Sequence, residues 1–170
     1  STGLRAIIQA HTDFWEVTQD GLDWALEKCG VDGDAELRER LLALYWELQA
    51  YPEVPEMLQT LKTAGLNTAI LSNGSPDMLD GAVQSAGIET LLDDNLSVQS
   101  VGIFKPDSRV YDLVGHRFSC AKDEVLFVSS NGWDAAGATG YGFTTAWVNR
   151  SGEPMDRMPW KPKHVLRDLT

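Results

Sequence analysis

The sequence is poor in basic residues. Its 170 residues include 14 Lys and Arg against 25 Asp and Glu, which gives a formal net charge of −11. A field of that sign repels phosphate backbones and anionic lipid, and no run of Lys or Arg interrupts it. We therefore expect neither nucleic acid nor a membrane as a partner, and an anionic substrate would need a local cluster of hydrogen-bond donors.

Cysteine is scarce, and long apolar runs are missing. Cys29 and Cys120 are the two cysteines, and their spacing matches no CxxC or metal-binding pattern. We interpret them as reduced thiols of a cytoplasmic protein, with a disulfide between them as the alternative. No apolar stretch approaches the roughly 18 residues that span a bilayer, which predicts a soluble protein.

Phosphate-binding glycine patterns are also missing. The glycines at 132, 137, 140 and 142 lack the Gly-Lys-Ser/Thr ending of a P-loop and fit no GxGxxG register. Close packing of a helix against the sheet is the better explanation for the run Ala135-Ala-Gly-Ala138.

The ends of the chain are unusual. It opens with Ser1-Thr-Gly-Leu4 rather than an initiator methionine, and His164 to Leu169 reads as a helix that stops short. We therefore expect a fragment of a longer protein.

The first fifty residues have a helical pattern. Asp13 and Glu16 resemble a capping box at the start of one helix, and Cys29-Gly30 ends that helix with a glycine. Asp34 begins a second helix, whose apolar stripe runs from Leu37 to Leu48. This region is therefore predicted to form a helical subdomain.

From residue 51 onward, helices alternate with apolar strands. Helices are predicted at 54–64, 76–86, 107–118 and 133–139, and strands at 68–71, 96–98, 125–128 and 144–148. Such repeated units predict an α/β domain over residues 51–170, with a parallel sheet covered by helices on both faces. Ligands of such folds bind at the carboxyl ends of the strands.

Two of the predicted strands are followed by polar groups that could serve a site. Ser72 and Asn73 end one strand, where free N–H groups of the next helix could help them bind an oxyanion. Lys105 precedes a helix in the extended backbone before a proline, and Tyr111 lies about one turn into that helix. Each feature alone also fits a capped turn or a solvated lysine.

The strand over 125–128 ends in an unusually polar stretch. Four potential donors and acceptors follow it closely: Ser129, Ser130, Asn131 and Asp134. Because the carboxyl ends of parallel strands share one edge of a sheet, the three polar strand ends together predict a shared active site.

At these three strand ends the sequence resembles the haloacid dehalogenase superfamily. The stretches Leu71-Ser-Asn-Gly-Ser-Pro76, Lys105-Pro-Asp-Ser-Arg-Val-Tyr111 and Phe127-Val-Ser-Ser-Asn-Gly-Trp-Asp134 are similar to those of its L-2-haloacid dehalogenases. His11-Thr-Asp-Phe-Trp15 is similar to the latter part of their cap domain. The resemblance implies a partial cap over residues 1–50 and a Rossmann-like core over residues 51–170 that lacks its first strand.

One motif separates the reaction classes of this superfamily. Its phosphatases place Gly-Asp at the third strand end, with another acid four residues on, so that carboxylates hold Mg²⁺. This sequence has Ser129-Ser130 there and Asp134 as the one acid of the loop. Mg²⁺ prefers several oxygen ligands with carboxylates among them. The resemblance therefore implies a reaction without metal or cofactor.

The family mechanism uses an aspartate on the first strand as nucleophile, which the resemblance places upstream of Ser1. By resemblance, Lys105 keeps that carboxylate ionised with help from Ser129 and Tyr111. Asn131 and Asp134 orient or activate the hydrolytic water and hold the lysine in place.

The same resemblance assigns residues to the substrate. Ser72 and Asn73 would bind the substrate carboxylate and the departing halide. Phe14 from the cap and Trp133 from the loop would form an apolar wall that dehydrates the reacting carbon.

The expected activity is hydrolytic removal of halide from short (S)-2-haloalkanoic acids, by a cytoplasmic protein that the family resemblance suggests is a homodimer. A Mg²⁺-dependent phosphomonoesterase of the same superfamily is one alternative. The other alternative is a truncated, non-catalytic copy that binds small carboxylates.

Overall fold

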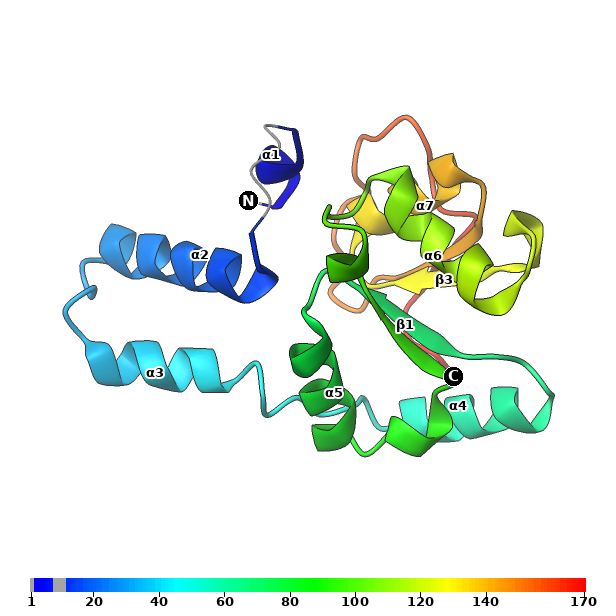
Figure 1. Ribbon diagram of the computed structural model, residues 1–170, viewed down its shortest axis with the longest axis horizontal. Coiled ribbons are helices and arrows are strands. Elements are labelled where there is room, and N and C mark those ends of the chain that lie inside the picture. The colour runs from blue at the N-terminus through cyan, green and yellow to red at the C-terminus, as the bar shows by residue number, and fades with distance from the viewer. Residues whose placement is uncertain (1, 8–11) are drawn as a thin grey trace. The chain divides into compact units, whose positions relative to one another are not determined.

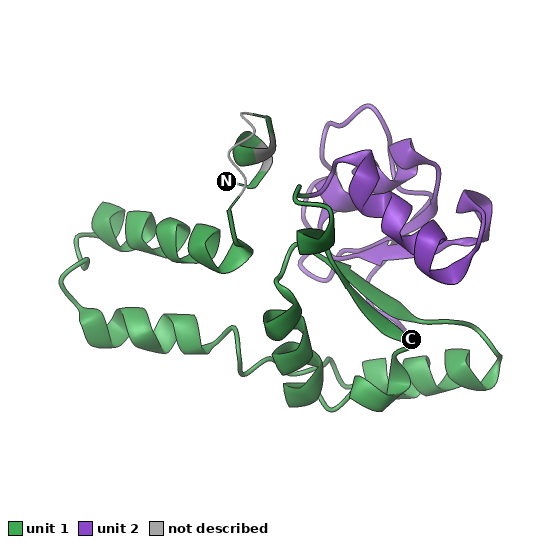
Figure 2. Ribbon diagram, viewed as in Figure 1, with its two compact units in different colours: residues 1–104 green, residues 105–170 purple. Residues whose placement is uncertain are grey.

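The computed structural model describes residues 2–7 and 12–170. Their contacts divide the chain into two compact units, residues 1–104 and residues 105–170 (Figure 2). His11 of the predicted cap motif lies outside the described residues. The predicted boundary between residues 50 and 51 remains a prediction.

The first unit begins with three helices: α1 (Thr2–Ile7), α2 (Phe14–Cys29) and α3 (Ala35–Ala43) (Figure 1). Asp13 caps α2 by accepting a hydrogen bond from the backbone N–H of Trp15 at 2.8 Å. Glu16 accepts from the Thr12 hydroxyl, so the pair does not form the reciprocal capping box expected from the sequence. Gly30 ends α2 with a left-handed φ of 70°.

The helix α3 is shorter than its apolar stripe predicts. It ends at Ala43, and Tyr45 and Trp46 donate their backbone N–H groups to carbonyls three residues back. This tighter winding carries Trp46 against Gly81, where an added Cβ would lie 3.0 Å from the indole ring. Trp46 therefore packs on Gly81 from a turn that follows α3, rather than from a longer helix.

The rest of the first unit is a strand–helix unit with parallel strands. Its helices are α4 (Val54–Thr63) and α5 (Pro76–Ser85), and β1 (Ala69–Ser72) pairs in parallel with β2 (Asp94–Ser97). The small core of this region contains Leu58, Val83 and Ile88. The second strand starts two residues earlier than predicted, and Val98 begins a short 3₁₀ turn (Val98–Ser100). A second such turn spans Glu89–Leu91.

The second unit holds a three-stranded parallel sheet in the order β3-β4-β5. Its elements are α6 (Ser108–Phe118), a 3₁₀ turn (Lys122–Glu124), β3 (Leu126–Ser129), α7 (Gly132–Tyr141), β4 (Thr144–Val148) and β5 (His164–Leu166). An aromatic cluster fills its interior: Tyr111, Phe127, Tyr141 and Phe143. The α/β class with parallel strands and helices on both sides is confirmed, with one hydrogen-bonded sheet in each unit.

The predicted helix at the end of the chain is wrong. His164 to Leu166 form a strand that pairs in parallel with β4, with Val165 opposite Trp147. A three-residue segment is too short for a stable helix, whereas the edge of β4 offers it backbone hydrogen bonds. The pattern of apolar residues within this segment cannot reveal that β4 has an edge open for pairing.

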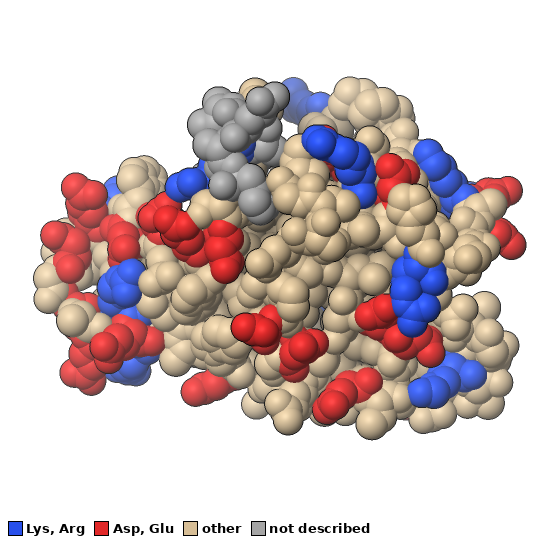
Figure 3. Space-filling view, in the orientation of Figure 1, with Lys and Arg blue, Asp and Glu red and all other residues tan. Residues whose placement is uncertain are grey.

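The charged side chains on the surface agree with the net negative charge of the sequence. Figure 3 shows acidic side chains spread over the visible face, with basic ones among them. Cys29 and Cys120 are both free, as expected. None of the described helices has the length and apolar character needed to cross a bilayer.

Candidate active site

A buried ion pair lies at the centre of the second unit. The Nζ atom of Lys105 donates to Oδ2 of Asp134 at 2.9 Å, and each side chain is only 6% exposed. Lys105 begins the segment that leads into α6, and Asp134 lies in the first turn of α7. A buried charge is tolerated when it is paired and hydrogen-bonded, and both conditions hold here.

The Asp134 carboxylate has two further donors. The Tyr111 hydroxyl donates to its Oδ1 at 3.0 Å, and the Ser129 hydroxyl donates to its Oδ2 at 3.1 Å. Three donors therefore occupy most of the roughly four lone-pair positions of a carboxylate. This arrangement fixes the rotamer of Asp134 and leaves a lone-pair position for about one more donor, such as a water molecule.

Burial sets the electrostatics of this cluster. Burial lowers the pKa of Lys105, and the negative charge of Asp134 opposes that effect. Burial also raises the pKa of Tyr111, with Asp134 adding to the shift. Tyr111 therefore stays a protonated donor at neutral pH, while the charge of Lys105 depends on its partners.

The other predicted residues of this loop lie at the start of α7. Asn131 precedes α7, and its backbone N–H donates to the Ser129 hydroxyl at 3.2 Å. Trp133 lies in the first turn of α7 and is 37% exposed. The structure thus joins Lys105 and Ser129 in one network, with the Asn131 backbone supporting it.

Gly137 has a role that the sequence reasoning assigned to helix–sheet packing. An added Cβ at this position would lie 2.9 Å from Cβ of Pro106 and 3.0 Å from the Tyr111 hydroxyl. The glycine therefore lets α7 approach the turn after Lys105 and the Tyr111 side chain, both of which belong to the network. The run from Ala135 to Ala138 does belong to a helix that packs on β3 and β4, as expected, while Gly137 itself faces the Lys105-Pro106 turn and α6.

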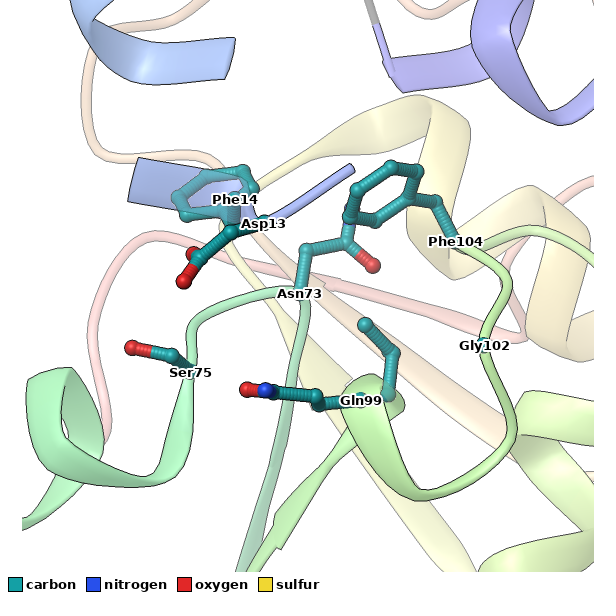
Figure 4. A pocket seen from close by; sticks show the side chains of 8 residues that line it. Asp13, Phe14, Asn73, Ser75, Gln99, Gly102 and Phe104 are labelled. Carbon is teal, nitrogen blue, oxygen red and sulfur yellow. The ribbon is translucent and has the colours of Figure 1, made fainter. Parts of the chain in front are cut away.

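A pocket of about 240 Å³ lies within the first unit. Figure 4 shows the rings of Phe14 and Phe104 on one side and the polar side chains of Ser75 and Gln99 on the other. The two rings meet edge to face, with centroids 6.3 Å apart. The full lining is Asp13, Phe14, Asn73, Ser75, Val98, Gln99, Gly102 and Phe104.

The pocket contains two of the predicted substrate residues of this unit. Phe14 and Asn73 line it, whereas Ser72 is not among its lining residues. The Ser72 hydroxyl accepts a hydrogen bond from the backbone N–H of Gly74 at 3.1 Å and shapes the turn after β1. Sequence reasoning missed Gln99, which no motif marks, and Ser75, although it stands in the same quoted stretch as Asn73.

The donor set of the second unit suits an anion or a nucleophilic carboxylate better than a cation. One ammonium and two hydroxyls surround the single carboxylate of Asp134. Within the described part of the chain, no group of three His, Cys, Asp or Glu side chains is arranged to hold a metal ion.

The fold and this site define a member of a known hydrolase class. The chain belongs to the haloacid dehalogenase-like hydrolase family, whose family model matches residues 3–142. It is 42% identical to (S)-2-haloacid dehalogenase 1 of Pseudomonas sp. (strain CBS-3), over 98% of this chain and 73% of that relative. The (S)-2-haloacid dehalogenase of Pseudomonas sp. (strain YL) is also 42% identical, over 99% of this chain and 72% of the relative.

Solved structures agree with this assignment. An L-2-haloacid dehalogenase that is 38% identical superposes with a TM-score of 0.94, over 99% of this chain and 76% of that one. The L-2-haloacid dehalogenase from Xanthobacter autotrophicus with chloropropionic acid covalently bound is 34% identical, with a TM-score of 0.87 over 98% and 76% of the two chains. The resemblance drawn from three motifs is therefore confirmed, and the chain spans about three quarters of these relatives' length.

Proposed function

We propose that this protein is a hydrolase that releases halide from short (S)-2-haloalkanoic acids and forms (R)-2-hydroxy acids. The observation that carries the proposal is the buried network of Lys105, Tyr111, Ser129 and Asp134, found in a chain 42% identical to (S)-2-haloacid dehalogenases. The network supplies hydrogen-bond donors and the Asp134 carboxylate in fixed positions. A displacement by a separate carboxylate nucleophile requires such fixed groups around it.

The proposed reaction has two steps. A carboxylate oxygen of a nucleophilic aspartate attacks C2 of the substrate, and the carbon–halogen bond breaks as halide leaves with the bonding pair. Water then attacks the carbonyl of the resulting ester, which releases the 2-hydroxy acid and restores the carboxylate. In this proposal the nucleophile belongs to the quarter of the relatives' length that the chain does not match.

Each member of the network has a role in the proposal. The Lys105 ammonium keeps the nucleophilic carboxylate ionised, because an opposite charge close by favours the charged form. Ser129 and Tyr111 hold Asp134, and Asp134 holds the lysine. Asp134 and Asn131 orient the water that hydrolyses the ester. Asp134 does so with the lone-pair position that its three donors leave unoccupied.

The pocket of the first unit is proposed to receive the substrate. Asn73 donates to the substrate carboxylate, with Ser72 supporting the turn that carries it. Phe14 provides an apolar wall that excludes water from the reacting carbon, and the same role for Trp133 remains a prediction from the family resemblance. A volume of about 240 Å³ suits an acid of a few carbons.

We further propose that the protein forms a homodimer in the cytoplasm. Large apolar side chains of the first unit are exposed, among them Trp24 (61%), Leu44 (56%) and Tyr45 (42%). Large exposed apolar side chains of this kind favour association. Two free cysteines fit a reducing compartment. Light scattering coupled to gel filtration measures the oligomeric state, and a monomer at every concentration contradicts the dimer.

The test of the activity is halide release from (S)- and (R)-2-chloropropionate in the presence of EDTA, using the protein expressed from its complete coding sequence. We expect turnover of the (S) enantiomer alone. Activity that requires Mg²⁺, together with hydrolysis of p-nitrophenyl phosphate, would identify the phosphomonoesterase alternative. No turnover of either substrate class, with retained binding of small carboxylates, would identify a non-catalytic protein.

A further inference from the structure

The aromatic ring of Phe127 lies beside the buried ammonium of Lys105. The Nζ atom of the lysine is 4.9 Å from the centroid of the ring, which is within the ~6 Å range of a cation–π attraction. Lys105 is 6% exposed and Phe127 is 8% exposed. The attraction therefore acts with little water to screen it, where cation–π contacts are strongest.

The alternation of β3 brings this ring to the site. Phe127 and Ser129 are two residues apart on a strand, so their side chains leave the same face. The Ser129 hydroxyl donates to Asp134, while the ring of Phe127 faces Lys105. One face of β3 thus supports both members of the ion pair, the carboxylate with a hydroxyl and the ammonium with a π face.

We propose that Phe127 is a positioning residue that holds Lys105 in its protonated form and in its place beside Asp134. An apolar surrounding alone favours the neutral amine, and burial does lower the pKa of Lys105. The electron-rich face of the ring opposes this loss without adding a second negative charge. The kinetic consequence of this inference rests on the proposed function, because it assumes that turnover needs the ammonium.

The titratable groups near the Lys105 ammonium can be named element by element. Within residues 105–170, Asp134 from α7 is a carboxylate paired with Lys105, and Tyr111 from α6 reaches the pair through that carboxylate. In the proposed function the nucleophilic aspartate faces the same ammonium. Neither β3 nor β4 carries a titratable side chain. Other acidic groups of α6 and its start have partners of their own: Asp107 with Arg109, and Asp112 with Tyr141.

The experiment changes the ring without changing its size. Phe127 is replaced with mono-, di- and trifluorinated phenylalanine in the protein expressed from its complete coding sequence, and kcat/KM is measured against pH. Fluorine withdraws electron density from the ring face and so weakens its attraction for the ammonium. We therefore expect the alkaline limb of the kcat/KM profile, where activity falls with rising pH, to move to lower pH with each added fluorine. With Phe127→Leu, which removes the ring, the limb should move by about one pH unit.

Phe143→Leu is the matched control. Phe143 is 6% exposed and its ring stacks on that of Phe127, with centroids 6.0 Å apart, in the same aromatic cluster. Its loss should lower the melting temperature much as Phe127→Leu does, yet leave the alkaline limb in place. An equal shift in both variants, or a limb that ignores fluorination, overturns the proposal.

A direct titration separates this inference from the proposed function. The ¹³Cε resonance of Lys105, assigned with Lys105→Arg, reports its protonation by NMR without any turnover. A pKa that falls along the fluorinated series supports the inference even if halide release is absent, in which case the proposed function alone fails. A pKa that stays constant along the series refutes the inference even if the enzyme is an active dehalogenase.

Discussion

The two units of the molecule place their polar groups in opposite settings. In residues 105–170, the side chains of Lys105 and Asp134 are each 6% exposed and form a network with fixed partners. In residues 1–104, Ser75 is half-buried and Gln99 is exposed on a pocket whose apolar side is Phe14 and Phe104. The first arrangement holds charge in one geometry before any ligand arrives, whereas the second offers a shape that solvent and ligand can enter.

This difference predicts that substitutions in the two regions change different kinetic parameters. A preorganised charge stabilises a transition state most, so its removal should lower kcat. A pocket group that holds the substrate carboxylate, which is unchanged in the reaction, binds ground state and transition state alike, so its loss should raise KM. Substitutions in each unit test that separation.

The largest effect is expected from Lys105→Ala. A buried carboxylate without its cationic partner takes up a proton and stops acting as a nucleophile. We expect no detectable halide release and a loss of roughly 3 kcal/mol in unfolding free energy, at the low end for breaking a buried pair because Asp134 keeps its two hydroxyl donors. Urea unfolding and circular dichroism check that the fold survives.

Lys122→Ala is the control for this variant. The Lys122 ammonium also lies over an aromatic ring, 3.7 Å from the centroid of Tyr141, but outside the network. It should retain most of the activity. Full turnover by Lys105→Ala would remove the second unit from the chemistry altogether.

Asp134→Asn should slow the second step more than the first. The amide keeps the size of the carboxylate but cannot accept a proton from water, and loss of such a general base typically costs about 10²–10⁴ in rate. Mass spectrometry of protein mixed with substrate should then detect a covalent ester that accumulates. Asp112→Asn, whose carboxylate bonds to Tyr141 away from the cluster, should trap none. Equal accumulation in both variants would contradict the role of Asp134.

The members of this network could be predicted from the sequence because each follows a strand end or opens a helix. Lys105 lies before α6, Ser129 ends β3 and Asp134 lies in the first turn of α7, and polar groups at a strand end or a helix start are the ones expected to serve a site in such folds. The ring of Phe127 could not be assigned in this way, since an apolar residue in a strand is read as core. Its contact with the ammonium depends on the packing of the segment before α6 against β3.

The end of α3 and the last strand illustrate the same limit. The stripe from Leu37 to Leu48 has helical spacing throughout, but α3 ends at Ala43 and Trp46 packs on Gly81, far along the chain. The strand β5 exists because β4 offers it an edge. Periodicity describes a segment by itself, whereas these outcomes are decided by a distant partner.

Gly137→Ala should lower kcat about tenfold, a smaller effect than the loss of a charged group. The new methyl would meet Pro106 at 2.9 Å and the Tyr111 hydroxyl at 3.0 Å, and Tyr111 is fully buried, so the network must shift. Gly140→Ala is the matched control on the same helix, because its methyl would meet the ring of Trp160 at 2.6 Å. Both variants should lose stability, but only Gly137→Ala should lose kcat at constant KM.

The smallest effect is expected from Asn73→Ala in the pocket of the first unit. Loss of one hydrogen bond to a charged substrate group raises KM by about tenfold, and kcat should change little because the network of the second unit stays intact. Asn95→Ala is the control, since Asn95 lies in β2 of the same unit, is partly buried and does not line the pocket. Initial rates over a range of 2-chloropropionate concentrations separate KM from kcat. A fall in kcat for Asn73→Ala as large as that for Asp134→Asn would show that the pocket takes part in the chemical step, and the division of labour between the two units would then be untenable.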